Sequence, residues 1–286
     1  MTRSVGGLAS HIASGRTKFT RCMLIEMLDG TTLGITDHDR NIEYDLGDGL
    51  QTYYADTGIF PSAVQFSVGL EADNFEVSGP LTARLTRAQV LGGRLDMATV
   101  RLFDVRWDNL AQGHVPLMKG YISGATVEGG AFRFEVRSVA DRYNQVVGRI
   151  ISPYCSHDFG DARCGYSVES EALTIDTVTD LLTLTVTGFG GPVPADRYFN
   201  SGLIQFDSGD LVGVRSTQIF KWTSATRQVI LESPLPDLPA PGDNVTLFRG
   251  CGKTRQDCKD RSNILNFGGF PDVPGTDKTL RYPVPK

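Results

Sequence analysis

Four of the five cysteines form two pairs whose thiols could bind a metal or make disulfides. Eight residues separate Cys155 from Cys164, six separate Cys251 from Cys258, and 86 lie between the two pairs. Structural zinc sites usually draw each pair from a tight knuckle with about two to four intervening residues. These pairs are wider, and iron–sulfur clusters also use four cysteine thiolates, at spacings that differ between families. The pattern indicates a metal site without fixing the metal, and disulfides or unpaired core thiols stay open as alternatives.

The other chemical candidates are weaker. Cys22 lies in the apolar run RCMLIEML and is most simply a small buried hydrophobe. His157 could replace a cysteine as a ligand, although an isolated loop histidine is more often solvated. The N-terminus has no continuous apolar stretch of the signal-peptide kind, and no window approaches about 18 apolar residues. We therefore expect synthesis in the cytosol, no stable membrane insertion, and cysteines that are free thiols or metal ligands.

Catalysis would have to use Asp37, His38 and Asp39 in the sequence ITDHDR. These residue types suit acid–base chemistry or a catalytic metal. Adjacent side chains on a strand point to opposite faces, however, so the three converge only if a loop bends them together. A turn rich in capping groups is the favoured interpretation, and no nucleophile elbow, P-loop or dinucleotide fingerprint occurs. The sequence therefore predicts no enzyme activity, and a metal-dependent or iron–sulfur enzyme stays as the alternative function.

The elements that must position these residues are mostly strands. Two apolar runs flank Asp29-Gly30 and predict a β-hairpin. Further short segments rich in β-branched or aromatic residues and bounded by Gly, Asp, Asn or Pro bring the total to at least seven strands: 98–107, 130–139, 180–188, 202–214 and 227–235. Helical periodicity is limited to 82–93 and 138–148. The fold class is therefore mainly β, built from barrels or sandwiches with a helix or two.

The predicted domain boundary lies near 148–152, where a strand and a possible helix give way to irregular, cysteine-bearing sequence. This divides the chain into residues 1–150 and 151–286. Residues 167–248 form a separate run of predicted strands, so the simplest arrangement is a small β module inserted between two halves of one cysteine site. The chain leaves that site and returns to it.

Composition limits the function further. The chain has 286 residues, 21% of them charged, and a net charge of −5 with acidic and basic residues interspersed. Without a basic block, sequence-specific binding of nucleic acid is not expected. A chain of this length buries enough surface to fold without a metal site or a disulfide, so we expect any such site to stabilise only the structure around it.

The segment after the last cysteine, SNILNFGGFP, places Gly268 and Gly269 between aromatic residues. Glycines there would allow positive φ and a close approach to a neighbouring group. Asn263 and Asn266 could cap or hydrogen-bond the loop, and the alternative is a plain surface turn. The proline-rich residues 270–286 are predicted to lie extended over a neighbour.

The two cysteine segments, YCSHDFGDARCGY and GCGKTRQDCKDRSNILNFGGFPDVPG, together with residues 28–79, resemble tail-tip (baseplate) hub proteins of long-tailed bacteriophages and phage-derived gene transfer agents. The resemblance covers most of the chain. It implies hub domains of β-barrel type in residues 1–150 and a C-terminal domain, residues 151–286, whose 167–248 part is a β-rich insertion. It also implies a [4Fe–4S] cluster, with zinc as the alternative, on the ligands Cys155, Cys164, Cys251 and Cys258.

The same resemblance implies a structural protein of a virion or virion-like particle, assembled in the bacterial cytoplasm. It would form a homotrimer that links the distal tail protein ring to other tail-tip or fibre-like proteins. DNA would pass through its pore without sequence-specific binding.

Overall fold

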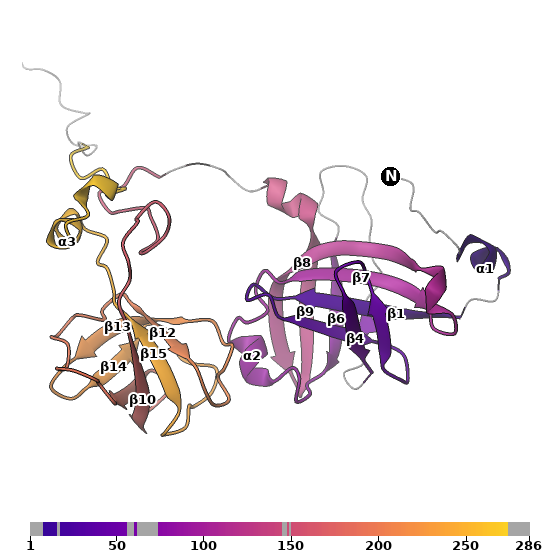
Figure 1. Cartoon of the computed structure of the whole chain (residues 1–286), viewed down its shortest axis with the longest axis horizontal. Coiled ribbons are helices and arrows are strands. Elements are labelled where there is room, and N and C mark those ends of the chain that lie inside the picture. Colours follow the sequence, from indigo (N-terminus) through magenta and orange to yellow (C-terminus); the bar gives the residue numbers. More distant parts are fainter. Residues whose placement is uncertain are drawn as a thin grey trace, which may run out of the picture. The chain divides into compact units, whose positions relative to one another are not determined.

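The computed structural model describes residues 8–15, 18–55, 60–61, 74–144, 148 and 150–273. The chain divides into two compact units, Met1–Val146 with Gly213–Arg215, and Val147–Val212 with Ser216–Lys286. Both are dominated by strands (Figure 1). None of the described helices is long and apolar enough to cross a membrane.

The first unit is built on one nine-stranded sheet, in the order β3-β4-β2-β1-β7-β8-β9-β6-β5. Its strands are β1 (Phe19–Glu26), β2 (Thr32–Thr36), β3 (Ile42–Asp45), β4 (Leu50–Tyr54), β5 (Phe60–Pro61), β6 (Asn74–Pro80), β7 (Thr99–Arg106), β8 (His114–Glu128) and β9 (Ala131–Ser138). Its helical segments are α1 (Ala9–Ala13), α2 (Arg87–Leu91), η2 (Leu110–Gln112) and η3 (Val139–Asn144). Neighbouring strands pair antiparallel except for β2 and β4, which pair parallel.

Strand β1 is buried on both faces, which explains its continuous apolar run. Met23 and Ile25 belong to the larger core cluster, whereas Cys22 and Leu24 belong to a second cluster with Tyr53. Successive side chains of a strand point to opposite faces, so β1 separates the two clusters. The predicted hairpin is confirmed, because Gly30, at φ 82°, donates its N–H to Met27 O between β1 and β2.

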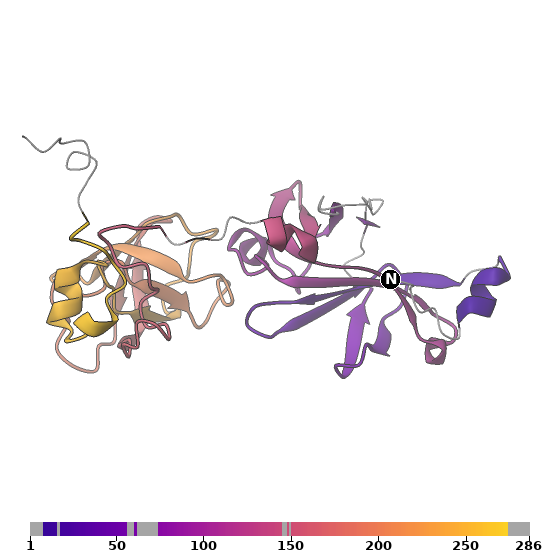
Figure 2. The ribbon, with the colours of Figure 1, turned by 90° about the horizontal axis from the view of Figure 1, so that it is seen from above.

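The second unit contains a closed barrel in the order β10-β11-β14-β13-β12-β15. Its strands are β10 (Ser170–Val178), β11 (Thr183–Thr187), β12 (Leu203–Phe206), β13 (Thr217–Thr223), β14 (Gln228–Leu231) and β15 (Asn244–Phe248). Helix α3 (Arg255–Asp260) and the 3₁₀ turn η4 (Ile264–Asn266) follow the barrel. The segments before β10 and after β15 lie together beyond one end of the barrel in Figure 1, and in front of the barrel in Figure 2, which is seen from above.

The prediction of a mainly β fold is confirmed, with two differences in detail. The closed barrel lies within the predicted insertion, whereas the described strands of residues 1–150, which were assigned to barrels, form one large sheet. Strand periodicity predicts strands, but the order in which distant strands pair decides whether a sheet closes. The predicted helix at 82–93 is reduced to α2, and the one at 138–148 to η3, with residues 145–147 outside the described part. Residues 274–286 of the predicted extended tail are also outside it.

Two glycines of β8 provide a test of the sheet. A Cβ on Gly120 would lie 2.2 Å from Arg137 O, while the nearest atom to a Cβ on Gly124 is Glu135 Oε2 at 3.9 Å. Gly120→Ala should force β8 away from β9 and destabilise the sheet by about 1–3 kcal/mol, whereas Gly124→Ala should be close to neutral. Hydrogen exchange of peptides from β8 and β9 measures both; equal protection in the two variants would contradict this packing.

Candidate metal centre

The four paired cysteines come together in the structure. All five cysteines of the chain are free thiols, so the disulfide alternative is not observed. Cys155, Cys164, Cys251 and Cys258 line one small cavity, which is completed by the following residues: His157, Phe159, Lys253, Thr254, Arg261 and Asn263. Cys164, Cys251 and Cys258 are buried, and Cys155 is partly buried.

Cys155 is held by both of the chain segments that meet at the cavity. Its N–H donates to Lys253 O at 2.8 Å, across the barrel insertion. Its Sγ accepts from the N–H of Gly268 at 3.3 Å. The Lys253 side chain also donates to His157 O. The first cysteine is therefore fixed in place by residues that follow the barrel.

Cys164 sits in a turn organised by one carboxylate. Asp161 Oδ1 accepts from the N–H groups of Arg163 at 3.0 Å and of Cys164 at 2.6 Å. These bonds, led by the one from Cys164, lower the pKa of Asp161 below its usual value. Asn263 Nδ2 donates to Cys164 O at 2.8 Å and to Cys164 Sγ at 3.6 Å, and Asn266 Nδ2 donates to Cys164 O at 3.0 Å. The predicted hydrogen-bonding role of the two asparagines is confirmed.

Cys258 is carried by helix α3, which a capping box begins. Thr254 Oγ1 accepts from Asp257 N at 3.1 Å, and Asp257 Oδ2 accepts from the N–H of Thr254 at 3.4 Å. Satisfying these two backbone donors stabilises the start of such a short helix. Sequence analysis overlooked this helix, although the Thr254-x-x-Asp257 spacing was a usable signal.

The loop bearing Gly268 and Gly269 packs tightly against the first cysteine segment. A Cβ on Gly268 would lie 2.6 Å from His157 Nε2, and one on Gly269 would lie 2.8 Å from the carbonyl carbon of Tyr154. Ser156 Oγ donates to Gly268 O at 3.2 Å. The predicted close approach is confirmed, although neither glycine has a positive φ. The alternative of a plain surface turn does not hold.

His157 is held by the backbone of the loop that follows α3. Its Nδ1 lies 3.1 Å from Asn266 O, within hydrogen-bonding distance, and its ring packs on Gly268. One ring nitrogen is therefore engaged with the backbone. The histidine lines the cavity as part of its wall.

Positive charge lies beside the thiols. Arg261 lines the cavity, donates through Nη2 to Gly250 O at 2.7 Å, and has its guanidinium 5.3 Å from the ring centre of Phe159. Its Nε is buried and has no hydrogen-bond partner among the described residues. A buried donor without an acceptor is costly, so this atom suits a cavity that holds an anionic group. Neither Arg261 nor Lys253 could be selected from sequence, because nothing but the fold brings them to the cysteines.

The thiols also influence each other. Burial raises the pKa of Cys258, and the charges of Cys155, Cys251 and Cys164 raise it further, against an opposing effect of Arg261. Four neighbouring thiolates therefore repel one another unless cations offset them. Soft sulfur donors select metals such as zinc, copper(I) and the iron of iron–sulfur clusters. Within the described ranges, however, no three His, Cys, Asp or Glu side chains are grouped to hold a single metal ion.

Cys22 is separate from this site. It is fully buried in β1, burial raises the pKa of its thiol to about 12, and its Sγ lies 3.5 Å from Thr36 Oγ1. Its assignment as a small core residue is confirmed.

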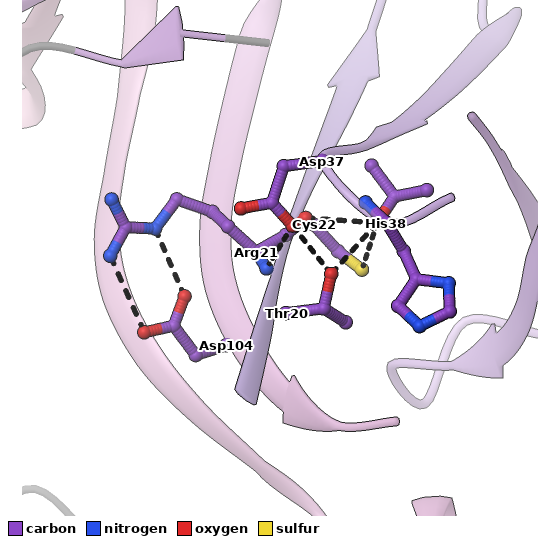
Figure 3. Close-up of polar contacts among 7 residues, drawn as sticks. Thr20, Arg21, Cys22, Asp37, His38 and Asp104 are labelled. Carbon is purple, nitrogen blue, oxygen red and sulfur yellow. Dashed lines mark hydrogen bonds and ion pairs between the residues drawn. The ribbon is translucent and has the colours of Figure 1, made fainter. Parts of the chain in front are cut away.

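The three candidate catalytic residues of ITDHDR do not all converge: His38 Nδ1 lies 2.8 Å from Asp39 Oδ1, but Asp37 is bound elsewhere. Asp37 Oδ1 accepts from Thr20 Oγ1 at 2.5 Å and from Arg21 N at 2.8 Å. The ring of His38 turns away from these contacts (Figure 3), and its Nδ1 accepts from Arg40 N at 3.1 Å. The carboxylate and the imidazole thus stabilise a turn, as the favoured interpretation predicted.

Comparison with known proteins agrees with a structural role. Residues 6–167 match the family described as "Baseplate hub protein, N-terminal attachment domain". Residues 197–277 match the family "Phage conserved hypothetical protein BR0599". The chain is thus a structural protein of a phage-like tail rather than an enzyme. Because the first match covers more than half of its length, the chain belongs to the baseplate hub protein family defined by that N-terminal attachment domain.

A solved structure extends the likeness to both units. A chain of the structure described as "Virion of native gene transfer agent (GTA) particle" superimposes with a TM-score of 0.84 at 29% sequence identity. The match covers 98% of this chain and 96% of that chain. No curated protein matches the sequence significantly.

Proposed function

We propose that this protein is the hub at the tail tip of a virion or virion-like particle. In this role it forms a homotrimer, links the distal tail protein ring to tip or fibre-like proteins, and surrounds part of the path along which DNA leaves. The observation that carries the proposal is the family match over residues 6–167, together with the likeness of nearly the whole chain to a protein of a gene transfer agent particle.

The sheet of the first unit supports an assembled state. Its described strands end on β3 and β5, whose outer edges have no further strand in the described part of the sheet. An open sheet edge can pair with another chain, and closed rotational symmetry would cover equivalent edges on every copy. A net charge of −5 is compatible with a conduit to which DNA does not adhere. Assembly in the bacterial cytoplasm follows from the same proposal.

The hub proposal predicts a threefold arrangement of this chain in the particle. Cryo-electron microscopy of purified tail tips, combined with quantification of the chain relative to the tail tube protein, tests it. A threefold ring next to the distal tail ring is the expected result. A sixfold arrangement of this chain, or its absence from the tip, would contradict the proposal.

We further propose that Cys155, Cys164, Cys251 and Cys258 hold a [4Fe–4S] cluster with a structural role. Two features support a cluster over a zinc ion. Cys155, Cys164, Cys251 and Cys258 line one cavity, and their pairs have eight and six intervening residues, more than the about two to four that are usual in structural zinc sites. The donors Gly268 N–H and Asn263 Nδ2 approach two of the sulfurs, and hydrogen bonds of this kind stabilise sulfur ligands of clusters.

Such a group, when bound, supplies four metal–sulfur bonds that join the two segments flanking the barrel. The chain's own residues prepare the site: Asp161 and the α3 capping box fix two cysteines, and Arg261 and Lys253 provide positive charge. Binding energy at a site formed only on folding becomes folding energy, about 10 kcal/mol or more for structural zinc sites. That value far exceeds the roughly 1 kcal/mol of a single hydrogen bond.

Cys258→Ser tests this staple, and Cys22→Ala is the matched control that removes the thiol outside the site. Cys258→Ser should abolish visible iron–sulfur absorption and increase protease cleavage in residues 150–169 and 249–273. The barrel and the first unit should stay protected, because each has its own buried core. Cys22→Ala should keep the absorption. Unchanged protease protection in a Cys258→Ser protein without metal would show that the site does not staple the fold.

A further inference from the structure

A second site lies on the barrel, in a hollow that the cysteine centre does not use. Strand β13 forms one side and the loop before β12 forms the other. The residues that line it include two cations, one carboxylate, one amide and two aromatic side chains: Asp196, Arg197, Asn200, Phe220, Lys221, Trp222 and Thr223.

A β-bulge gives this hollow its side chains. The pairing of β13 with β14 shifts register between Ile219 and Lys221. As a result, Phe220 and Lys221 are both exposed, whereas a regular strand would turn one of them inward. Phe220 is 65% exposed. Bulges often redirect side chains at functional sites. The exposed phenyl ring of Phe220 does not contribute to the barrel core.

The opposite wall is rigid. Trp222 donates its backbone N–H to Asn200 Oδ1 at 2.7 Å and its indole Nε1–H to Pro194 O at 3.1 Å. Ser224 donates to Asp196 Oδ1 through its N–H at 2.7 Å and through Oγ at 2.8 Å. Arg197 adopts a φ of 69°, a left-handed conformation that costs a non-glycine residue about 1–2 kcal/mol. Such strain persists where neighbouring contacts fix the backbone, often at binding sites.

The charges of the hollow are available to a ligand. Among the described residues, neither Arg197 nor Lys221 forms a side-chain hydrogen bond or ion pair. Both lie near Asp196, whose pKa is lowered mainly by the hydrogen bonds from Ser224 and then by these two cations. Asp196 is therefore ionised at neutral pH and can accept hydrogen bonds from hydroxyl groups. Asn200, fixed through its Oδ1, keeps amide donors on the same wall.

We propose that this hollow binds a saccharide that carries carboxylate groups. The Phe220 ring offers an apolar surface against which the C–H face of a pyranose packs. Asp196 and Asn200 form hydrogen bonds with its hydroxyl groups. Arg197 and Lys221 bind its carboxylates. Guanidinium groups match carboxylates through paired hydrogen bonds. An aromatic ring beside cations also suits single-stranded nucleic acid, but a DNA strand offers no hydroxyl groups along its length for Asp196 and Asn200 to bind. The saccharide is therefore the favoured occupant.

Calorimetric titration of the full chain with oligogalacturonate tests the proposal. Binding is expected, and Phe220→Ala or Arg197→Gly should weaken it by about tenfold or more, corresponding to ~1.4 kcal/mol. Arg197→Gly removes the side chain at a backbone conformation that glycine tolerates. Arg227→Gly is the matched control, because Arg227 is an exposed arginine with a φ of 52° at the β13–β14 turn, outside the hollow. It should leave the affinity unchanged, and methyl-esterified oligogalacturonate should bind at least about tenfold more weakly, because the charged contacts are lost.

Three outcomes would overturn the proposal. The first is no binding of oligogalacturonate by the wild-type chain. The second is binding that Phe220→Ala and Arg197→Gly weaken no more than Arg227→Gly does, which would indicate non-specific charge attraction. The third is tighter binding of an oligothymidylate that depends on Phe220, which would make the hollow a nucleic-acid site.

Discussion

The pairing of the first barrel strand with the last is the constraint on which the C-terminal unit depends. Strands β10 and β15 run antiparallel, with Ser170 opposite Phe248. The chain therefore enters and leaves the barrel at the same end, side by side. Because of this closure, two cysteine pairs separated by 86 residues reach one cavity with short connecting segments. The entropic cost of closing so long a loop grows only slowly with its length. Burial of the barrel's own core offsets this cost.

Hydrogen bonds make the meeting of the two segments specific. Cys155 is bonded to residues that follow the barrel, and Cys164 is bonded to Asn263 and Asn266. The segment before the barrel is thus held in place by the segment after it. The thiols oppose this arrangement when they ionise, because burial and then the charges of the neighbouring thiolates raise the pKa of Cys258. A metal group would remove that repulsion. The geometry and the electrostatics of the cavity therefore both favour a metal group bound by the four thiolates.

The sequence predicted those features that depend on local patterns. The Asp29-Gly30 hairpin, the buried Cys22, the polar role of Asn263 and Asn266 and the close approach at Gly268 follow from residue type and spacing. The sequence predicted the β-rich insertion at 167–248 but not that its strands close into a barrel, and it assigned barrels to residues 1–150, whose described strands form one sheet. Both differences depend on pairing between distant strands. Likewise Lys253 and Arg261 carry no local signal that identifies them as neighbours of the cysteines.

The central claim is that the four clustered cysteines hold an iron–sulfur cluster that joins the two ends of the barrel. Iron, acid-labile sulfide and zinc analysis of the full chain, purified without oxygen, tests it most directly. The account predicts about four irons and four sulfides per chain, as in a [4Fe–4S] cluster with four cysteine ligands, and no stoichiometric zinc. Stoichiometric zinc without sulfide, or a folded chain without any metal, would contradict it.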